Sequence, residues 1–361
     1  MTNQSVRSKM AAASRRITRL KRIDRAAVFI ITLGGLAVVV GVLGILLFIG
    51  AEAVPLFRPA ALEPRDALLL PTAVSPAAPG LRAFGIDEYR RYAYVVEPDG
   101  RVVFYGLGDG RPALEFPIPG LDPGTPIRAS SRSHMGNYLA AGTDDGRVAL
   151  MQVQYLPRYE NEKLSGIDVS VRDRGVVQID AGRRPVREVS YLEQDGRTHV
   201  AAIVSDGEVA AWRTSEDGAE FQALLSVAAG QRVTLVRVGR NGAVVAATDK
   251  GRMYHWLFDE EQPRLTDVSP VANEPITAME FLIGGSSVVV GTASGQVTGW
   301  FRAPVADGAD AMVRAQTFEP QGAAIVAFAA SPRERSFAAS GADGSLVLRH
   351  QTSGRTLVRL D

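Results

Sequence analysis

The chain has 361 residues, 46% of them hydrophobic, a formal net charge of +1 at pH 7 and no cysteine. The lack of cysteine excludes a disulfide framework, a thiolate metal site and a cysteine-linked lipid anchor. After residue 25 the chain carries 32 basic and 38 acidic residues, a net charge of −6, which argues against a nucleic-acid-binding surface there.

The first 25 residues are strongly basic, and Asp24 is their only acidic residue. Such a tail is typical either of a nucleic-acid-binding arm or of the cytoplasmic flank of a membrane span. An apolar segment comes immediately after the tail and favours the second interpretation, the flank of a membrane span. The eight basic residues are Arg7, Lys9, Arg15, Arg16, Arg19, Lys21, Arg22 and Arg25.

Residues 26–51 contain no charge, and Thr32 is their only polar side chain. Because about 20 apolar residues in a helix cross a bilayer, we predict a transmembrane helix over 26–51. The basic residues then place 1–25 in the cytoplasm and everything after residue 51 outside it, which in a bacterium is the periplasm. Two alternatives are a signal peptide cleaved near Ala51-Glu52-Ala53 and a buried core helix, which normally carries a polar stripe.

Residues 52–80 form a proline-rich segment, for which we predict an extended, semi-rigid periplasmic linker. Within it, residues 67–70 are apolar and form the one candidate strand, at the edge of a sheet. The prolines are Pro55, Pro59, Pro64, Pro71, Pro76 and Pro79.

Residues 81–361 repeat one pattern six times: an apolar run, a short turn ending in glycine, and an alternating run. The turn glycines are Gly100, Gly146, Gly207, Gly251, Gly295 and Gly344. The residue two positions after each is apolar, and these are Val102, Val148, Val209, Met253, Val297 and Leu346. Five positions after three of the glycines come the protein's three tryptophans, Trp212, Trp256 and Trp300.

The glycines Gly207, Gly251 and Gly295 are spaced 44 residues apart, a period typical of the four-stranded blades of a β-propeller. The pattern predicts an all-β propeller with six visible blades, and leaves open whether the ring has a seventh. We expect each glycine to adopt a positive φ, and each tryptophan to cover a seam between blades. Residues 155–172 lengthen the second repeat, which predicts a long outer hairpin. The blades are expected over 81–121, 122–184, 185–231, 232–274, 275–322 and 323–361.

The Asp206-Gly207 turn followed by Trp212 resembles WD40-type repeats. The aspartate that follows tryptophan in those repeats is absent, because Arg213, Leu257 and Phe301 stand there. The resemblance therefore implies a propeller shape and says little about function.

Residues 24–38 and 50–57 resemble the start of the long form of bacterial phosphate ABC transporter permeases, the PstC type. In that family a basic tail and one helix precede a periplasmic propeller-like domain, and a multi-helix permease follows. The resemblance implies the bacterial inner membrane and three protein partners, namely a partner permease subunit, an ATPase subunit and a periplasmic phosphate-binding protein. No second membrane-length apolar run follows residue 51, so we expect the sequence to be an N-terminal fragment of such a permease.

No set of residues has the spacing of a catalytic, cofactor-binding or metal site, and none of these is predicted. The four histidines fall in different repeats, and His255 is expected to be a hydrogen-bonded structural residue. Residues 106–110 and 144–146 are interpreted as turns, not as phosphate or calcium loops. The basic residues 183, 184 and 187 are interpreted as a solvated strand edge, with anion binding as the alternative.

Three classes of function follow from these observations. The first is a non-enzymatic accessory domain of a phosphate-type importer, which binds protein partners. The second is a free-standing, membrane-tethered scaffold for envelope protein assembly. The third is a propeller enzyme, which would need charged or metal-binding residues at the mouth of the ring.

Overall fold

The computed structural model describes residues 3–54, 83–304 and 310–360, with side chains from residue 24 onward. The chain forms two compact units, Met1–Ala61 and Leu62–Asp361. Nearly all of the predicted linker, including the candidate strand at 67–70, lies outside the described residues.

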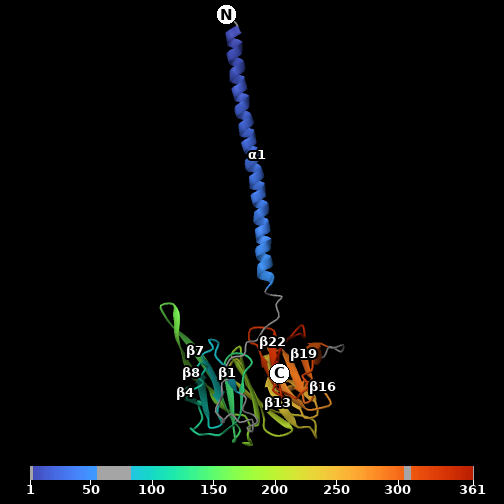
Figure 1. Ribbon diagram of the computed structural model, residues 1–361. Helices are drawn as coiled ribbons and strands as arrows, with labels where there is room; N and C mark the ends of the chain where they lie inside the picture. Colours follow the sequence, from blue (N-terminus) through green and yellow to red (C-terminus); the bar gives the residue numbers. More distant parts are fainter. Residues whose placement is uncertain (1–2, 55–82, 305–309, 361) are drawn as a thin grey trace. The chain divides into compact units, whose positions relative to one another are not determined.

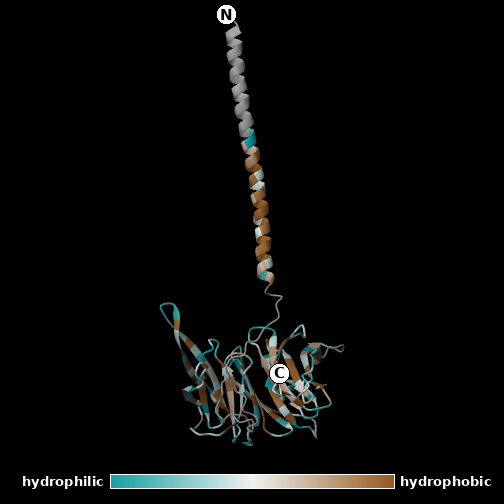
Figure 2. Cartoon of the chain, in the orientation of Figure 1, coloured by the Kyte–Doolittle hydropathy of each residue, from teal (hydrophilic) through white to brown (hydrophobic). Residues whose placement is uncertain are grey.

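The described part of the first unit is dominated by one long helix, α1 (Asn3–Ala53) (Figure 1). It begins well before residue 26, where the predicted membrane span starts, because the basic tail is also rich in good helix formers such as alanine, arginine and lysine. Its segment Asp24–Ala53 contains an 18-residue stretch with a mean hydropathy of 2.7, and the apolar side chains of the segment are exposed. Figure 2 shows the hydrophobic colouring of this part of the helix. This segment is long and apolar enough to cross a membrane, although a signal sequence meets the same criterion.

The second unit confirms the predicted all-β fold, since its described residues form six four-stranded antiparallel sheets. In every sheet the four strands pair in chain order, so each sheet is a meander. The first strands of successive sheets contact one another, which places them innermost around the propeller axis.

The first three sheets fall within the first three predicted repeats. Sheet 1 consists of β1 (Phe84–Ile86), β2 (Tyr92–Val96), β3 (Arg101–Gly106) and β4 (Pro112–Pro117). Sheet 2 consists of β5 (Ile127–Arg132), β6 (Tyr138–Thr143), β7 (Arg147–Glu160) and β8 (Lys163–Gln178). Sheet 3 consists of β9 (Glu188–Gln194), β10 (Arg197–Ile203), β11 (Glu208–Thr214) and β12 (Glu220–Ser226).

The last three sheets fall within the last three predicted repeats, and a 3₁₀ turn, η2 (Arg240–Gly242), follows β13. Sheet 4 consists of β13 (Val233–Val238), β14 (Ala243–Thr248), β15 (Arg252–Leu257) and β16 (Arg264–Pro270). Sheet 5 consists of β17 (Ile276–Phe281), β18 (Ser287–Thr292), β19 (Val297–Pro304) and β20 (Asp310–Thr317). Sheet 6 consists of β21 (Ile325–Ala330), β22 (Ser336–Gly341), β23 (Leu346–His350) and β24 (Thr356–Leu360).

The repeat glycines lie in the turn between the second and third strand of each sheet, as the repeat pattern predicts. Five of them have a positive φ, between 69° and 89°, which L-amino acids with a side chain rarely adopt. Gly207 is the exception, and the prediction of a positive φ is wrong there. Its turn closes without the left-handed conformation, and a β-carbon there would meet no atom within 4 Å.

The tryptophans lie in the predicted seams between sheets. Trp212 belongs to the apolar cluster between sheets 2 and 3, whereas Val209, three residues earlier, belongs to the cluster between sheets 3 and 4. Residues an odd number apart face opposite sides of a strand. The repeat therefore supplies its tryptophan to one seam and the apolar residue that follows its turn glycine to the other. Trp256 and Trp300 repeat this arrangement in the next two seams.

The sixth sheet departs from this regularity. The apolar residue two positions after the glycine is fully buried in the first five repeats, but Leu346 is 39% exposed. Apolar clusters join each of the first five sheets to the next. Among the described residues none joins sheet 6 to sheet 1, which are linked by the ion pair between Arg333 and Glu88 at 2.7 Å.

The second sheet carries the predicted long hairpin. Its strands β7 and β8 have 14 and 16 residues and pair along their whole length, with the tip between Glu160 and Lys163. Figure 1 shows this hairpin extending well beyond the other strands of the propeller. We call residues 155–170 the arm.

Candidate functional site

The inner strands of three sheets bring together a buried ionic triad that the sequence analysis did not predict. The Arg237 guanidinium lies 2.8 Å from Glu188 and 3.1 Å from Glu280, and the three side chains are 12%, 6% and 19% exposed. Burial raises the pKa of the Glu280 carboxyl despite the opposing effect of Arg237. The sequence signal that could have revealed the triad is one charged residue in each of two otherwise apolar or neutral strands, Arg237 in β13 and Glu280 in β17. The two occupy the same place in consecutive repeats.

The turn between β5 and β6 reaches across the inner strands of the propeller. His134 on this turn reaches from sheet 2 to sheet 5, where its ring lies 5.4 Å from the Phe281 ring. The neighbouring Met135 packs against the apolar cluster of sheets 3 and 4. Burial, together with Arg237 and Arg240, lowers the pKa of His134 to about 4, so this histidine is neutral at pH 7.

The remaining histidines are embedded in the sheets and turns. His199 and His255 are 5% and 4% exposed, and burial lowers the pKa of each to about 4. His255 Nδ1 is hydrogen-bonded to the Thr266 hydroxyl, as expected for a structural histidine. His350 accepts a hydrogen bond from the Ser353 backbone in a surface turn. Among the described residues no group of three histidine, aspartate or glutamate side chains is placed to hold a metal ion.

The basic cluster at 183–187 is engaged by local acids. Arg184 forms ion pairs with Asp180 at 2.8 Å and with Glu208 at 2.6 Å. Arg187, directly before β9, forms an ion pair with Asp206 in the turn between β10 and β11. Since these carboxylates offset the local positive charge, the geometry favours the interpretation as a solvated strand edge over anion binding.

The two glycine-containing motifs are turns, as interpreted from the sequence. In 106–110, Asp109 accepts a hydrogen bond from the Arg111 backbone, and the chain continues into β4. In 144–146, Asp145 accepts hydrogen bonds from the Arg147 side chain and the Thr143 hydroxyl. These acids are occupied in holding the turn itself.

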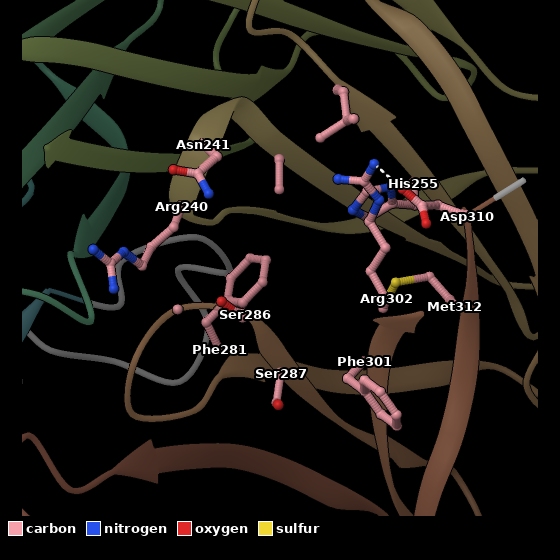
Figure 3. Close-up of a pocket in the computed structure, with 13 residues that line it drawn as sticks. Arg240, Asn241, His255, Phe281, Ser286, Ser287, Phe301, Arg302, Asp310 and Met312 are labelled. Carbon is pink, nitrogen blue, oxygen red and sulfur yellow. Dashed lines mark hydrogen bonds and ion pairs between the residues drawn. The ribbon is translucent and has the colours of Figure 1, made fainter. Parts of the chain in front are cut away.

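A cavity of about 350 Å³ lies between sheets 4 and 5 (Figure 3). Its apolar wall includes Phe281, Phe301 and Met312, and its polar groups come from strand ends and turns of both sheets. Arg302 pairs with Asp310 at one side of the cavity, beside His255, while Arg240 lies at the other side (Figure 3). The polar lining residues are Arg240, Asn241, His255, Ser286, Ser287, Arg302 and Asp310.

The arm is an amphipathic hairpin. The cross-strand pairs Tyr155–Val169 and Pro157–Ile167 share one face, because alternate residues of a strand point the same way. The opposite face carries Leu156, which is 61% exposed, and near the tip Tyr159 is also 61% exposed. The arm thus presents two large apolar side chains on a projecting element.

The second unit is a β-propeller by its topology and by its likeness to solved structures. It is similar to the β-propeller domain of Cps50 (Swd1) from Myceliophteria thermophila, with a TM-score of 0.50 and 16% sequence identity over 77% of this chain and 85% of that chain. At this identity the likeness shows the fold alone. No protein-family description and no curated protein matches the chain.

Proposed function

We propose that the chain is a membrane-anchored, non-enzymatic docking protein whose propeller lies outside the cytoplasm. The basic tail next to the apolar segment of α1 supports this orientation, because basic residues are retained on the cytoplasmic side. The observation that carries the docking role is the arm, which holds Leu156 and Tyr159 in solvent on a hairpin whose strands pair as far as its tip.

The partner that the sequence favours is a phosphate-type ABC importer of the bacterial inner membrane. The support is the resemblance of residues 24–38 and 50–57 to PstC-type permeases, in which a helix and a periplasmic propeller-like domain precede the permease helices. In this proposal α1 holds the propeller close to the translocation pore. The arm then contacts either the partner permease subunit or the periplasmic phosphate-binding protein.

The non-enzymatic character is supported by the way the ionisable groups on the inner strands are engaged. The buried charges of Arg237, Glu188 and Glu280 are paired with one another, and His134, packed against Phe281, is neutral at pH 7. A reactive acid, base or nucleophile must instead be free to approach a substrate.

Membrane orientation is tested by cysteine labelling, since the native chain has no cysteine. Ser353 lies in an exposed turn of sheet 6, so in intact spheroplasts a Ser353→Cys variant should react with a membrane-impermeant maleimide. Labelling only after the membrane is permeabilised would contradict the proposed orientation.

Docking is tested with the full chain in nanodiscs, immobilised and exposed separately to the purified phosphate-binding protein and the partner permease subunit. We expect micromolar binding to one of them, and at least tenfold weaker binding for Leu156→Ser/Tyr159→Ser. Leu224→Ser is the matched control, because Leu224 is 53% exposed on the outer strand of sheet 3. Binding to neither protein would contradict the importer role, and capture of an envelope assembly protein through the arm would favour the scaffold alternative.

A further inference from the structure

The cavity between sheets 4 and 5 has a rigid rim. The Arg240 backbone N–H donates to the Gly285 carbonyl at 3.1 Å, which ties the turn of sheet 4 to the turn of sheet 5. Asn241, in the left-handed conformation with φ 55°, is held from the other side by the Gln194 amide of sheet 3. The opening is therefore preformed and does not depend on a ligand for its shape.

One residue of the cavity's apolar wall, Phe301, is exposed at a position where the repeat normally buries its residue. Phe301 directly follows a seam tryptophan, as do Arg213 and Leu257 in the two preceding repeats. Those two residues are each 4% exposed, whereas Phe301 is 39% exposed. With Phe281 and Met312 it forms a surface suited to one large apolar side chain (Figure 3).

The polar groups of the cavity are separated into two ends. At one end the Thr266 hydroxyl donates to the His255 carbonyl at 3.0 Å, so His255 Nδ1 must donate to that hydroxyl. The His255 Nε2 atom is consequently an acceptor, next to the Arg302–Asp310 pair. At the other end, Arg240 is exposed and has no ion pair among the described residues. Figure 3 shows Arg240 on the opposite side of the Phe281 ring from His255 and Arg302.

We propose that this cavity binds an extended peptide segment of a protein partner, with one large apolar side chain against Phe281 and Phe301 and an acidic side chain at Arg240. At the other end a backbone N–H of the segment donates to His255 Nε2 or Asp310. A volume of about 350 Å³ is at the lower limit for ligand pockets, which fits one side chain with its adjoining backbone. This inference rests on the proposed docking role and gives it a second contact, separate from the arm.

The experiment selects peptides from a random displayed library on the full chain in nanodiscs. Selected peptides should share an acidic residue within a few positions of an aromatic or large aliphatic one. Their affinity for the Phe301→Ala and Arg240→Gln variants is then measured by fluorescence anisotropy. Each change should weaken binding about tenfold or more, Phe301→Ala by loss of an apolar contact and Arg240→Gln by loss of a charge-assisted hydrogen bond. Replacing the acidic residue of the peptide with the corresponding amide should have little further effect on its affinity for the Arg240→Gln variant.

The matched control is Arg335→Gln, which removes an exposed arginine from the corresponding turn of sheet 6 and should leave affinity unchanged. Equal binding to all variants, or selection of peptides with no acidic residue, would overturn the inference. Failure to select any peptide would also overturn it. The arm would still bind the importer protein in the docking assay above, so failure of the cavity is distinguishable from failure of the proposed function.

Discussion

Removal of the central cation of the ionic triad should destabilise the propeller severely. Arg237→Ala leaves the carboxylates of Glu188 and Glu280 buried, at 6% and 19% exposure, without the guanidinium that both contact. Breaking a buried ionic contact in this way costs about 3–5 kcal/mol in the free energy of unfolding. The matched control is Arg128→Ala, whose ion pair with Asp144 joins side chains that are 60% and 41% exposed; such pairs contribute about 1 kcal/mol or less.

The pH dependence of this loss has a definite sign. Burial already raises the pKa of Glu280, and without Arg237 that pKa rises further. The folded variant then binds protons at a higher pH than the unfolded chain does, so its stability falls as pH rises through the carboxylate range and above. The deficit relative to the native chain should therefore shrink between pH 7 and pH 5.

The assay is urea unfolding of the full chain in detergent micelles, followed by tryptophan fluorescence. All three tryptophans are buried in the seams of sheets 2 to 5, so the signal reports the propeller. Equal losses for Arg237→Ala and Arg128→Ala, or a deficit that grows on acidification, would refute the reasoning.

Two further predictions concern the turns and the histidines. Gly251→Ala should lower the free energy of unfolding in that assay by well over about 1 kcal/mol, because φ is +69° and the new β-carbon would lie 2.6 Å from the Glu274 carbonyl oxygen. Gly344→Ala should lower it by only about 1 kcal/mol, because φ is +89° but the β-carbon would enter open space. Similar losses for the two would contradict this. Each buried histidine has a folded pKa of about 4 and an ordinary unfolded pKa of 6.5, so stability should be lost as pH falls from 6.5 toward 4, by up to about 1.4 kcal/mol per pH unit per histidine. Replacing one with glutamine should flatten that slope in the same unfolding measurement, and an unchanged slope would contradict the assignment. The histidines are His134, His199 and His255.

The blades were predictable because one repeat places the same two constraints on every sheet. A turn glycine followed by an apolar residue fixes the hairpin and one seam, and Trp212, Trp256 and Trp300 mark the other seam. The continuation of α1 through the basic tail was not predicted, because hydrophobicity marks a membrane segment but not where a helix begins. The mistaken positive φ at Gly207 arose from extending a turn rule to a repeat that closes differently.

The candidate sites were harder to predict. Phe301 stands apart from Arg213 and Leu257, at the equivalent repeat positions, by its exposure, which depends on how the ends of sheets 4 and 5 meet. His134 contacts Phe281 across the ring, about 150 positions away in the sequence. No local pattern encodes such contacts. The arm was predictable because its extra residues interrupt the repeat length.

The most direct test of the docking proposal is site-specific photocrosslinking in living cells. A photoreactive amino acid at Tyr159 of the arm, with Leu224 as the control position, would report whether the arm touches a partner in place. The account predicts one discrete adduct from position 159, identified by mass spectrometry as the phosphate-binding protein or the partner permease subunit, and none from position 224. No adduct from the arm, or the same adducts from both positions, would contradict it.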